Sequence, residues 1–262
     1  MQRIRLRYTK RGRLRFTSHR DFQRAFERAL RRSSVPMAYS AGFTPHPKVS
    51  YANAAPTGVA SEAEYLEIAL TEARDPEQLR AQLDESLPTG LDVIDAVEVH
   101  TSNFADQLQA SVWEIRLDGV AVEEAAKAAE VFLAAERVEV ERLTKNGVRS
   151  FDARGAVAAL AVSEPQAAVQ PDGGTDIRSG RACAILRLVV RHATPAVRPD
   201  DVLSGLRATA DLAPPVPAAV TRLAQGPLDG ESGTVTDPLA PDRAAATAVP
   251  TATAGPRAAA TA

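Results

Sequence analysis

Cysteine is nearly absent from this sequence of 262 residues, in which Cys183 is the only one. Disulfide frameworks, four-cysteine zinc sites and cysteine-ligated iron–sulfur clusters each need several thiolates, so this chain alone can form none of them. Cys183 lies in the apolar segment 182–186, which predicts a buried and unreactive thiol.

Long apolar runs and recognisable cofactor motifs are also missing. No segment approaches the roughly 18 consecutive apolar residues of a membrane helix, and residues 1–5 alternate charged and apolar side chains, unlike the apolar core of a signal peptide. The sequence has no glycine-rich phosphate loop, no nucleophile elbow and no metal-ligand spacing. We therefore expect a cytoplasmic protein without a membrane partner, a metal or a cofactor.

Aromatic residues become scarce along the chain. Eight of the twelve lie in the first 65 residues, and Phe151 is the last. From about Leu228 the composition is dominated by Ala, Thr, Pro and Gly, which offer too little apolar surface to offset the entropy of ordering. We predict that residues 227–262 form a disordered tail.

The first hundred residues alternate between strand and helix patterns. Residues 2–8, 49–52, 63–70 and 91–99 favour strands. A helix is predicted from Ser18, the N-cap, to about residue 32, and a second helix follows Asp75 to about residue 83. This order of strand, helix, strand, strand, helix, strand is that of the split βαβ arrangement of ferredoxin-like domains.

A second, looser repetition of this pattern begins near Ala110. Strands are predicted over 110–117, 138–141 and 182–191, helices over 123–135, 155–162 and 199–209, a hairpin turn at 145–147 and a surface loop at 171–174. We therefore expect an α+β fold of two ferredoxin-like units. The first, with a basic helix, spans residues 1–100, the second spans 108–226, and the disordered tail follows.

The net charge of −2 conceals a strong asymmetry. Residues 1–50 contain thirteen cations and two carboxylates, a net charge of +11, whereas residues 61–100 contain eleven carboxylates and two arginines, a net charge of −9. Such segregation predicts a face that attracts polyanions. In the alternative interpretation, the two segments fold together and neutralise each other.

The candidate site residues follow from the first helix and the irregular segment 39–48. The helix places apolar residues at core spacing and arginines on the remaining surface, while two prolines keep the backbone around His46 extended. The candidate residues for binding RNA or another anion are His19, Arg20, Arg24, Arg28, Arg31, Tyr39, His46 and Lys48. Their structural alternatives are a solvated helix face and a loop anchored on the core.

Four segments resemble a known bacterial family. Residues 16–21 (FTSHRD), 24–32 (RAFERALRR), 38–48 (AYSAGFTPHPK) and 58–66 (GVASEAEYL) resemble the radical SAM-linked family, whose function is unknown. Some members are fused behind a cobalamin-binding radical SAM domain, and others are free-standing. The likeness is dense over residues 1–70 and looser near 197–203.

The resemblance implies a partner enzyme, because this chain cannot hold a radical SAM cluster by itself. A radical SAM site holds its cluster with three cysteines, and this chain has one. The resemblance therefore implies that a radical SAM enzyme, in some cases cobalamin-binding, acts in trans as the partner of this chain.

Three functions remain open at this point. The first is a non-catalytic accessory protein of a radical SAM enzyme that binds transfer or ribosomal RNA through the basic helix. The second is a protein-interaction adaptor that binds no RNA. The third is a metal-independent endoribonuclease that uses His19 or His46 as general acid or base. A pocket on which both histidines converge would favour the nuclease, and an open basic face would favour binding.

Overall fold

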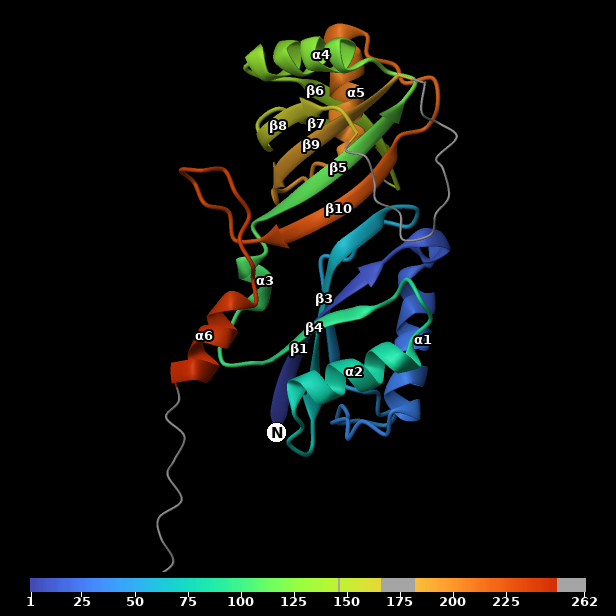
Figure 1. Ribbon diagram of the computed structural model, residues 1–262, viewed down its shortest axis with the longest axis vertical. Helices are drawn as coiled ribbons and strands as arrows, with labels where there is room; N and C mark the ends of the chain where they lie inside the picture. Colours follow the sequence, from blue (N-terminus) through green and yellow to red (C-terminus); the bar gives the residue numbers. More distant parts are fainter. Residues whose placement is uncertain (146, 166–181, 249–262) are drawn as a thin grey trace, which may run out of the picture.

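The computed structural model of the protein describes residues 1–145, 147–165 and 182–248 (Figure 1). Its strands are β1 (Gln2–Lys10), β2 (Val49–Ala52), β3 (Ala60–Leu70), β4 (Val93–Glu98), β5 (Ala110–Asp118), β6 (Glu139–Thr144), β7 (Gly147–Asp152), β8 (Val157–Ser163), β9 (Cys183–Arg191) and β10 (Ala219–Gly226). Its α-helices are α1 (His19–Arg32), α2 (Pro76–Ser86), α3 (Phe104–Gln107), α4 (Val122–Ala134), α5 (Pro199–Ala210) and α6 (Ala240–Ala248), and a 3-10 helix spans Gly12–Phe16.

Eight of the described strands form one sheet. Their order is β4-β1-β3-β10-β5-β9-β8, and β2 also pairs with β3. Every pairing is antiparallel except that of β3 with β10. The predicted α+β class is therefore confirmed. Within the part of the chain that the structure describes, no helix is long and apolar enough to cross a membrane.

The N-terminal half of the sheet forms because β1 alternates apolar and basic side chains. Ile4, Leu6 and Tyr8 share one core with apolar residues of α1 and α2. The ring of Tyr8 stacks on Phe22 of α1 with 4.4 Å between centroids. Helix α1 begins as predicted, since the Ser18 hydroxyl accepts a hydrogen bond from the Asp21 amide at 3.1 Å.

The C-terminal half repeats this layering with a second core. Apolar residues of α4 and α5, among them Phe132 and Leu206, pack in one cluster with Ile115 of β5 and Leu188 of β9. The predicted turn at 145–147 joins β6 to β7, whose ends pair Thr144 with Gly147, while Asn146 lies outside the described residues. The predicted loop at 171–174 also lies outside them.

The helix predicted over 155–162 is wrong. This segment is strand β8, in which Val157 pairs with Val190 and Leu160 with Leu188 of β9. Alanine favours a helix locally, but pairing with β9 satisfies the backbone and buries both apolar side chains in the second core. Tertiary contacts therefore override the local preference.

The two halves meet where β10 pairs with β3 over only two residue positions. Thr221 lies opposite Ala60, and Arg222 lies opposite Ser61. Figure 1 shows the N-terminal half below this contact and the C-terminal half above it, with α6 returning to the lower half. We call the region around this pairing the junction.

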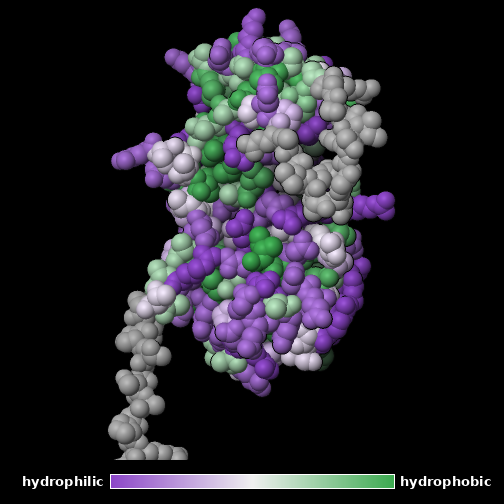
Figure 2. Space-filling view, in the orientation of Figure 1, coloured by the Kyte–Doolittle hydropathy of each residue, from purple (hydrophilic) through white to green (hydrophobic). Residues whose placement is uncertain are grey.

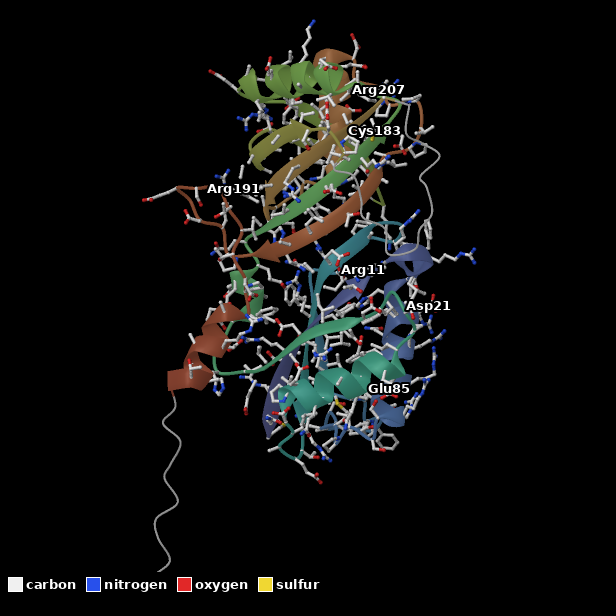
Figure 3. All side chains as sticks on the ribbon, viewed as in Figure 1. Arg11, Asp21, Glu85, Cys183, Arg191 and Arg207 are labelled. Atoms are coloured by element: carbon white, nitrogen blue, oxygen red, sulfur yellow. The ribbon has the colours of Figure 1, made fainter. Side chains whose placement is uncertain are left out.

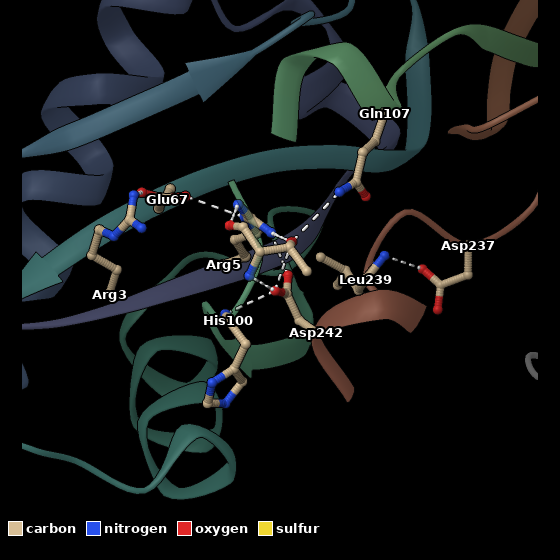
Figure 4. A network of polar contacts seen from close by, with 9 residues as sticks. Arg3, Arg5, Glu67, His100, Gln107, Asp237, Leu239 and Asp242 are labelled. Atoms are coloured by element: carbon tan, nitrogen blue, oxygen red, sulfur yellow. Dashed lines mark hydrogen bonds and ion pairs between the residues drawn. The ribbon is translucent and has the colours of Figure 1, made fainter. Parts of the chain in front are cut away.

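The prediction of a tail without structure from residue 227 is wrong for residues 227–248. Leu239 is fully buried beside Tyr65 and Phe104, and α6 begins one residue later. Asp242 of α6 is also fully buried and pairs with Arg5 of β1 (Figure 4). Buried Leu239 and a buried carboxylate with several donors anchor this segment, which composition could not reveal. Residues 249–262 lie outside the described residues.

Candidate functional site

Three cations of β1 and the turn that follows it are neutralised by carboxylates. Arg3 and Arg5 both pair with Glu67 of β3, at 3.1 and 3.2 Å, because β1 and β3 are antiparallel neighbours. Arg11 pairs with Glu62 and also with Asp92, the latter at 3.4 Å. For this group, mutual neutralisation of the basic and acidic segments is the right interpretation.

The arginines of α1 are in a different situation. Among the described residues, no carboxylate lies within 4.0 Å of Arg20, Arg28 or Arg31, and all three are exposed. Arg24 approaches Asp21 at 3.9 Å, but both side chains are more than half exposed. Such a pair contributes at most about 0.5 kcal/mol, so Arg24 remains available to an external anion.

These four arginines form one stripe, which we call the basic helix surface. Their separations of four, four and three residues place them along one side of a helix. Since α1 has 14 residues, the helix is about 21 Å long. In Figure 3 side chains project outward from this helix, beginning at the labelled Asp21, and Figure 2 shows a largely hydrophilic face on the lower half.

His19 is exposed at the start of α1. Its Nε2 lies 3.1 Å from Nε2 of the Gln23 side chain, and its ring contacts Tyr51 of β2 edge-on with 4.8 Å between centroids. These contacts fix the ring beside the first turn of α1. The imidazole therefore lies at one end of the basic helix surface.

His46 belongs to the loop 39–48, where it is also exposed. Its Nδ1 lies 2.9 Å from the Ser40 hydroxyl, which in turn accepts a hydrogen bond from the His46 amide at 3.1 Å. Tyr39 and Phe43 in the same loop expose 51% and 109% of their surface, so neither side chain anchors the loop on the core. Both rings are accessible to a ligand, as is Lys48.

The structure does not bring the two histidines together. His19 contacts Tyr51 near the end of β2, whereas His46 precedes the start of that strand by three residues. Strand residues rise about 3.3 Å each, so Tyr51 and Lys48 are separated by about 10 Å and His46 lies beyond Lys48. The candidate binding residues thus form an open surface along α1, with His46 and Lys48 apart from His19.

Cys183 differs from its expected environment. It is half-buried at the start of β9, where burial raises the pKa of its thiol and so disfavours the reactive thiolate. Among the residues that the structure describes, no group of three or more His, Cys, Asp or Glu side chains could hold a metal ion.

A feature that the sequence analysis missed is a cavity of about 380 Å³ at the junction. Asn53 and Val59 of the N-terminal half line it, together with Trp113, His192 and Arg222 of the C-terminal half. These residues are far apart in the sequence and share no motif. The sequence feature that could have indicated this site is Arg222, the single arginine in the mostly small and apolar strand β10.

One family matches most of the chain. Residues 3–199, about three quarters of the sequence, match the family described as "Uncharacterized protein conserved in bacteria (DUF2344)". No curated protein matches the chain. The matched region contains the whole basic helix surface, the loop 39–48 and most of the residues that line the junction cavity. The chain therefore belongs to the bacterial DUF2344 family.

Proposed function

We propose that this protein is a non-catalytic RNA-binding protein whose contact surface is the basic helix surface of α1. The observation that carries the proposal is the contrast between two groups of cations in one segment. Arg3 and Arg5 of β1 pair with a carboxylate of β3, while Arg20, Arg24, Arg28 and Arg31 of α1 have exposed guanidinium groups with almost no acidic partners among the described residues. An uncompensated row of arginines attracts the phosphates of a nucleic acid.

Exposed aromatic rings near both ends of this row favour single-stranded RNA. Phe16, 58% exposed, precedes α1, and the Arg15 guanidinium lies over its ring at 4.6 Å. Tyr39 and Phe43 lie in the loop after α1. Bases stack on such rings, and the arginines bind the backbone between them. Duplex RNA would not expose its bases in this way.

The proposed partner is a radical SAM enzyme acting in trans. This part rests on the resemblance of segments 16–21, 24–32, 38–48 and 58–66 to the radical SAM-linked family. With a single cysteine, the chain supplies no cluster site of its own. In this scheme the protein works in the cytoplasm and presents transfer or ribosomal RNA to the enzyme.

We also infer that each half is a ferredoxin-like unit. The N-terminal strands lie in the order β4-β1-β3-β2, and the C-terminal strands in the order β10-β5-β9-β8, with antiparallel neighbours throughout. In each half, one helix follows the first strand and a second precedes the last. This order supports the split βαβ arrangement for residues 1–100 and 108–226.

A salt-dependent binding measurement tests the proposal. The triple variant Arg20→Gln, Arg24→Gln, Arg28→Gln should lower affinity for single-stranded RNA without unfolding the helix, since glutamine has a similar helix propensity. If each arginine contacts one phosphate, the slope of log K against log salt falls by about 2, at about 0.7 per contact. Fluorescence anisotropy at several salt concentrations measures both quantities.

A matched control removes three exposed arginines from the C-terminal half. The variant Arg137→Gln, Arg149→Gln, Arg207→Gln has the same net charge as the α1 variant and should bind RNA nearly as the unmodified protein does. Equal loss in both variants would contradict a defined surface. No RNA affinity, combined with capture of a protein partner that RNA does not displace, would favour the adaptor. RNA cleavage that disappears in His19→Ala or His46→Ala would favour the nuclease.

A further inference from the structure

The junction cavity has a polar framework that is already fixed by buried contacts. Arg222 of β10 is almost fully buried and pairs with Glu64 of β3, which is also buried. Its Nε donates to the Ser61 hydroxyl at 3.3 Å, and its guanidinium lies over the Trp113 ring at 5.4 Å. Among the described residues its Nη1 donates to none, so this guanidinium retains donor capacity at the cavity wall.

His192 shapes the cavity without adding charge. Its Nδ1 donates to the Leu108 carbonyl at 2.6 Å, which leaves Nε2 to accept a hydrogen bond from the Ser111 hydroxyl at 2.8 Å. Burial lowers the pKa of His192 below its usual value, which favours the neutral imidazole. The ring is therefore held in one tautomer and one orientation.

Two further arginines line the cavity with exposed side chains. Among the described residues, no carboxylate lies within 4.0 Å of the guanidinium group of Arg191, at the end of β9 (labelled in Figure 3), or of Arg198, just before α5. The backbone amide of Arg198 donates a hydrogen bond to Asp201 at 2.7 Å. Asp200 is the one carboxylate among the described residues of the lining. Because Arg222 is already paired with Glu64, the charge that remains for a ligand comes from Arg191 and Arg198 opposed by Asp200, a net excess of one positive charge.

Much of the remaining wall is apolar, with Asn53 and Thr57 as further polar residues. Ala54, Pro56, Val59, Val197 and Val220 contribute to it, and the volume of about 380 Å³ falls within the range of about 300–1,000 Å³ of small-molecule sites. An apolar wall with a few convergent cations suits a ligand that has an apolar body and one anionic group.

We propose that the junction cavity binds a small organic anion, a carboxylate or phosphate ester on an apolar group, with Arg191, Arg198 and Arg222 as its binding residues. The cavity shares no residue with the basic helix surface. Binding here is therefore independent of RNA binding, and each can fail without the other.

Trp113 gives a direct readout because it is the only tryptophan in the chain and lines the cavity. The full-length protein is titrated at constant ionic strength with phenyl phosphate, with benzoate and with phenol, and Trp113 emission is followed. We expect a saturable change with at least one anion, at a Kd on the order of 1 mM for ligands of this size, and none with phenol. If both anions saturate, the one with the lower Kd identifies the preferred anionic group.

Two variants and a control connect this signal to the cavity. Arg191→Gln and Arg198→Gln each remove an exposed side chain and should raise the Kd about tenfold, the effect of losing one charge-assisted hydrogen bond. Arg207→Gln, at an exposed position on α5 outside the cavity, should leave it unchanged. The proposal is overturned if neither anion gives a saturable change, if phenol binds as well as the anions, or if the three variants behave alike.

Discussion

Whether a cation in the first fifty residues pairs with a carboxylate or stays exposed depends on the element that carries it. On β1, Arg5 alternates with apolar neighbours and meets Glu67 across an antiparallel pair. On α1, Arg28 points away from the core and meets no carboxylate among the described residues. The same residue type is therefore structural in the strand and available in the helix, since a strand neighbour is about 5 Å away and a helix surface faces solvent.

Phe43 provides a test of stacking at the scale of one side chain. It is fully exposed in the loop 39–48, so Phe43→Ala should change the free energy of unfolding by less than about 0.5 kcal/mol. If a base stacks on this ring, the variant should lose about 1–3 kcal/mol of RNA-binding energy. Leu143→Ala on β6, also highly exposed, is the control. Unchanged RNA affinity of the Phe43 variant would remove this ring from the proposed surface.

At the scale of elements, the helices and strands with a clear hydrophobic period were predictable from the sequence. The elements that were predicted wrongly or missed have physical explanations. The alternation of β1 and the capped, amphipathic α1 were both predicted, because local periodicity and burial agree there. The segment of β8 was predicted as a helix because its alanines favour one locally, whereas its partner β9 is distant in sequence. Helix α6 was missed because its anchors, Leu239 and Asp242, contact residues that are distant in the sequence.

Of these anchors, Asp242 gives a prediction about α6. The Asp242 carboxylate accepts hydrogen bonds from the amides of His100 and Thr101, at 2.9 and 2.8 Å, and pairs with buried Arg5 (Figure 4). Asp242→Asn should lower the free energy of unfolding by about 3 kcal/mol, because it leaves a buried guanidinium with one carboxylate fewer. Urea unfolding measures this, with Asp106→Asn on the exposed side of α3 as the control.

The same carboxylate makes stability depend on acid pH. Burial by itself raises the pKa of Asp242, but hydrogen bonds from His100 and Thr101 and the charge of Arg5 outweigh it and hold the pKa below its usual value. The stabilisation is therefore present above the unfolded pKa of about 3.9 and is lost as pH falls through the lower folded pKa. The stability difference from Asp242→Asn should shrink in that window. If the stability difference between the unmodified protein and Asp242→Asn stayed constant until Asp242 was fully protonated, the pH dependence could not be assigned to this carboxylate.

At the scale of the whole molecule, the junction depends on polar contacts more than on strand pairing. Only two residue pairs join β3 to β10, but Arg222 and Glu64 form a buried ion pair across it, and the Gln225 side chain donates to the Ala63 carbonyl at 2.6 Å. Burying either charge without the other would be strongly unfavourable. The two halves can therefore pack together here only if both side chains are present.

Breaking one side of that pair should be more harmful than removing both. Glu64→Gln leaves Arg222 buried without its carboxylate and should cost about 3–5 kcal/mol in unfolding free energy. Adding Arg222→Met removes the stranded charge and should recover part of that loss. Urea unfolding of both single variants and the double variant gives the coupling energy. Additive losses would show that the two side chains do not stabilise each other.

The sequence by itself determined the α+β class, the position and capping of α1, the run of arginines along it, and the lack of thiolates for a cluster or disulfide. These depend on local periodicity and composition. Only the tertiary structure decided which cations are neutralised, that residues 227–248 return to β1, and that a cavity lies between the halves. Those outcomes depend on contacts between residues up to 237 positions apart, such as Arg5 with Asp242, which no local pattern encodes.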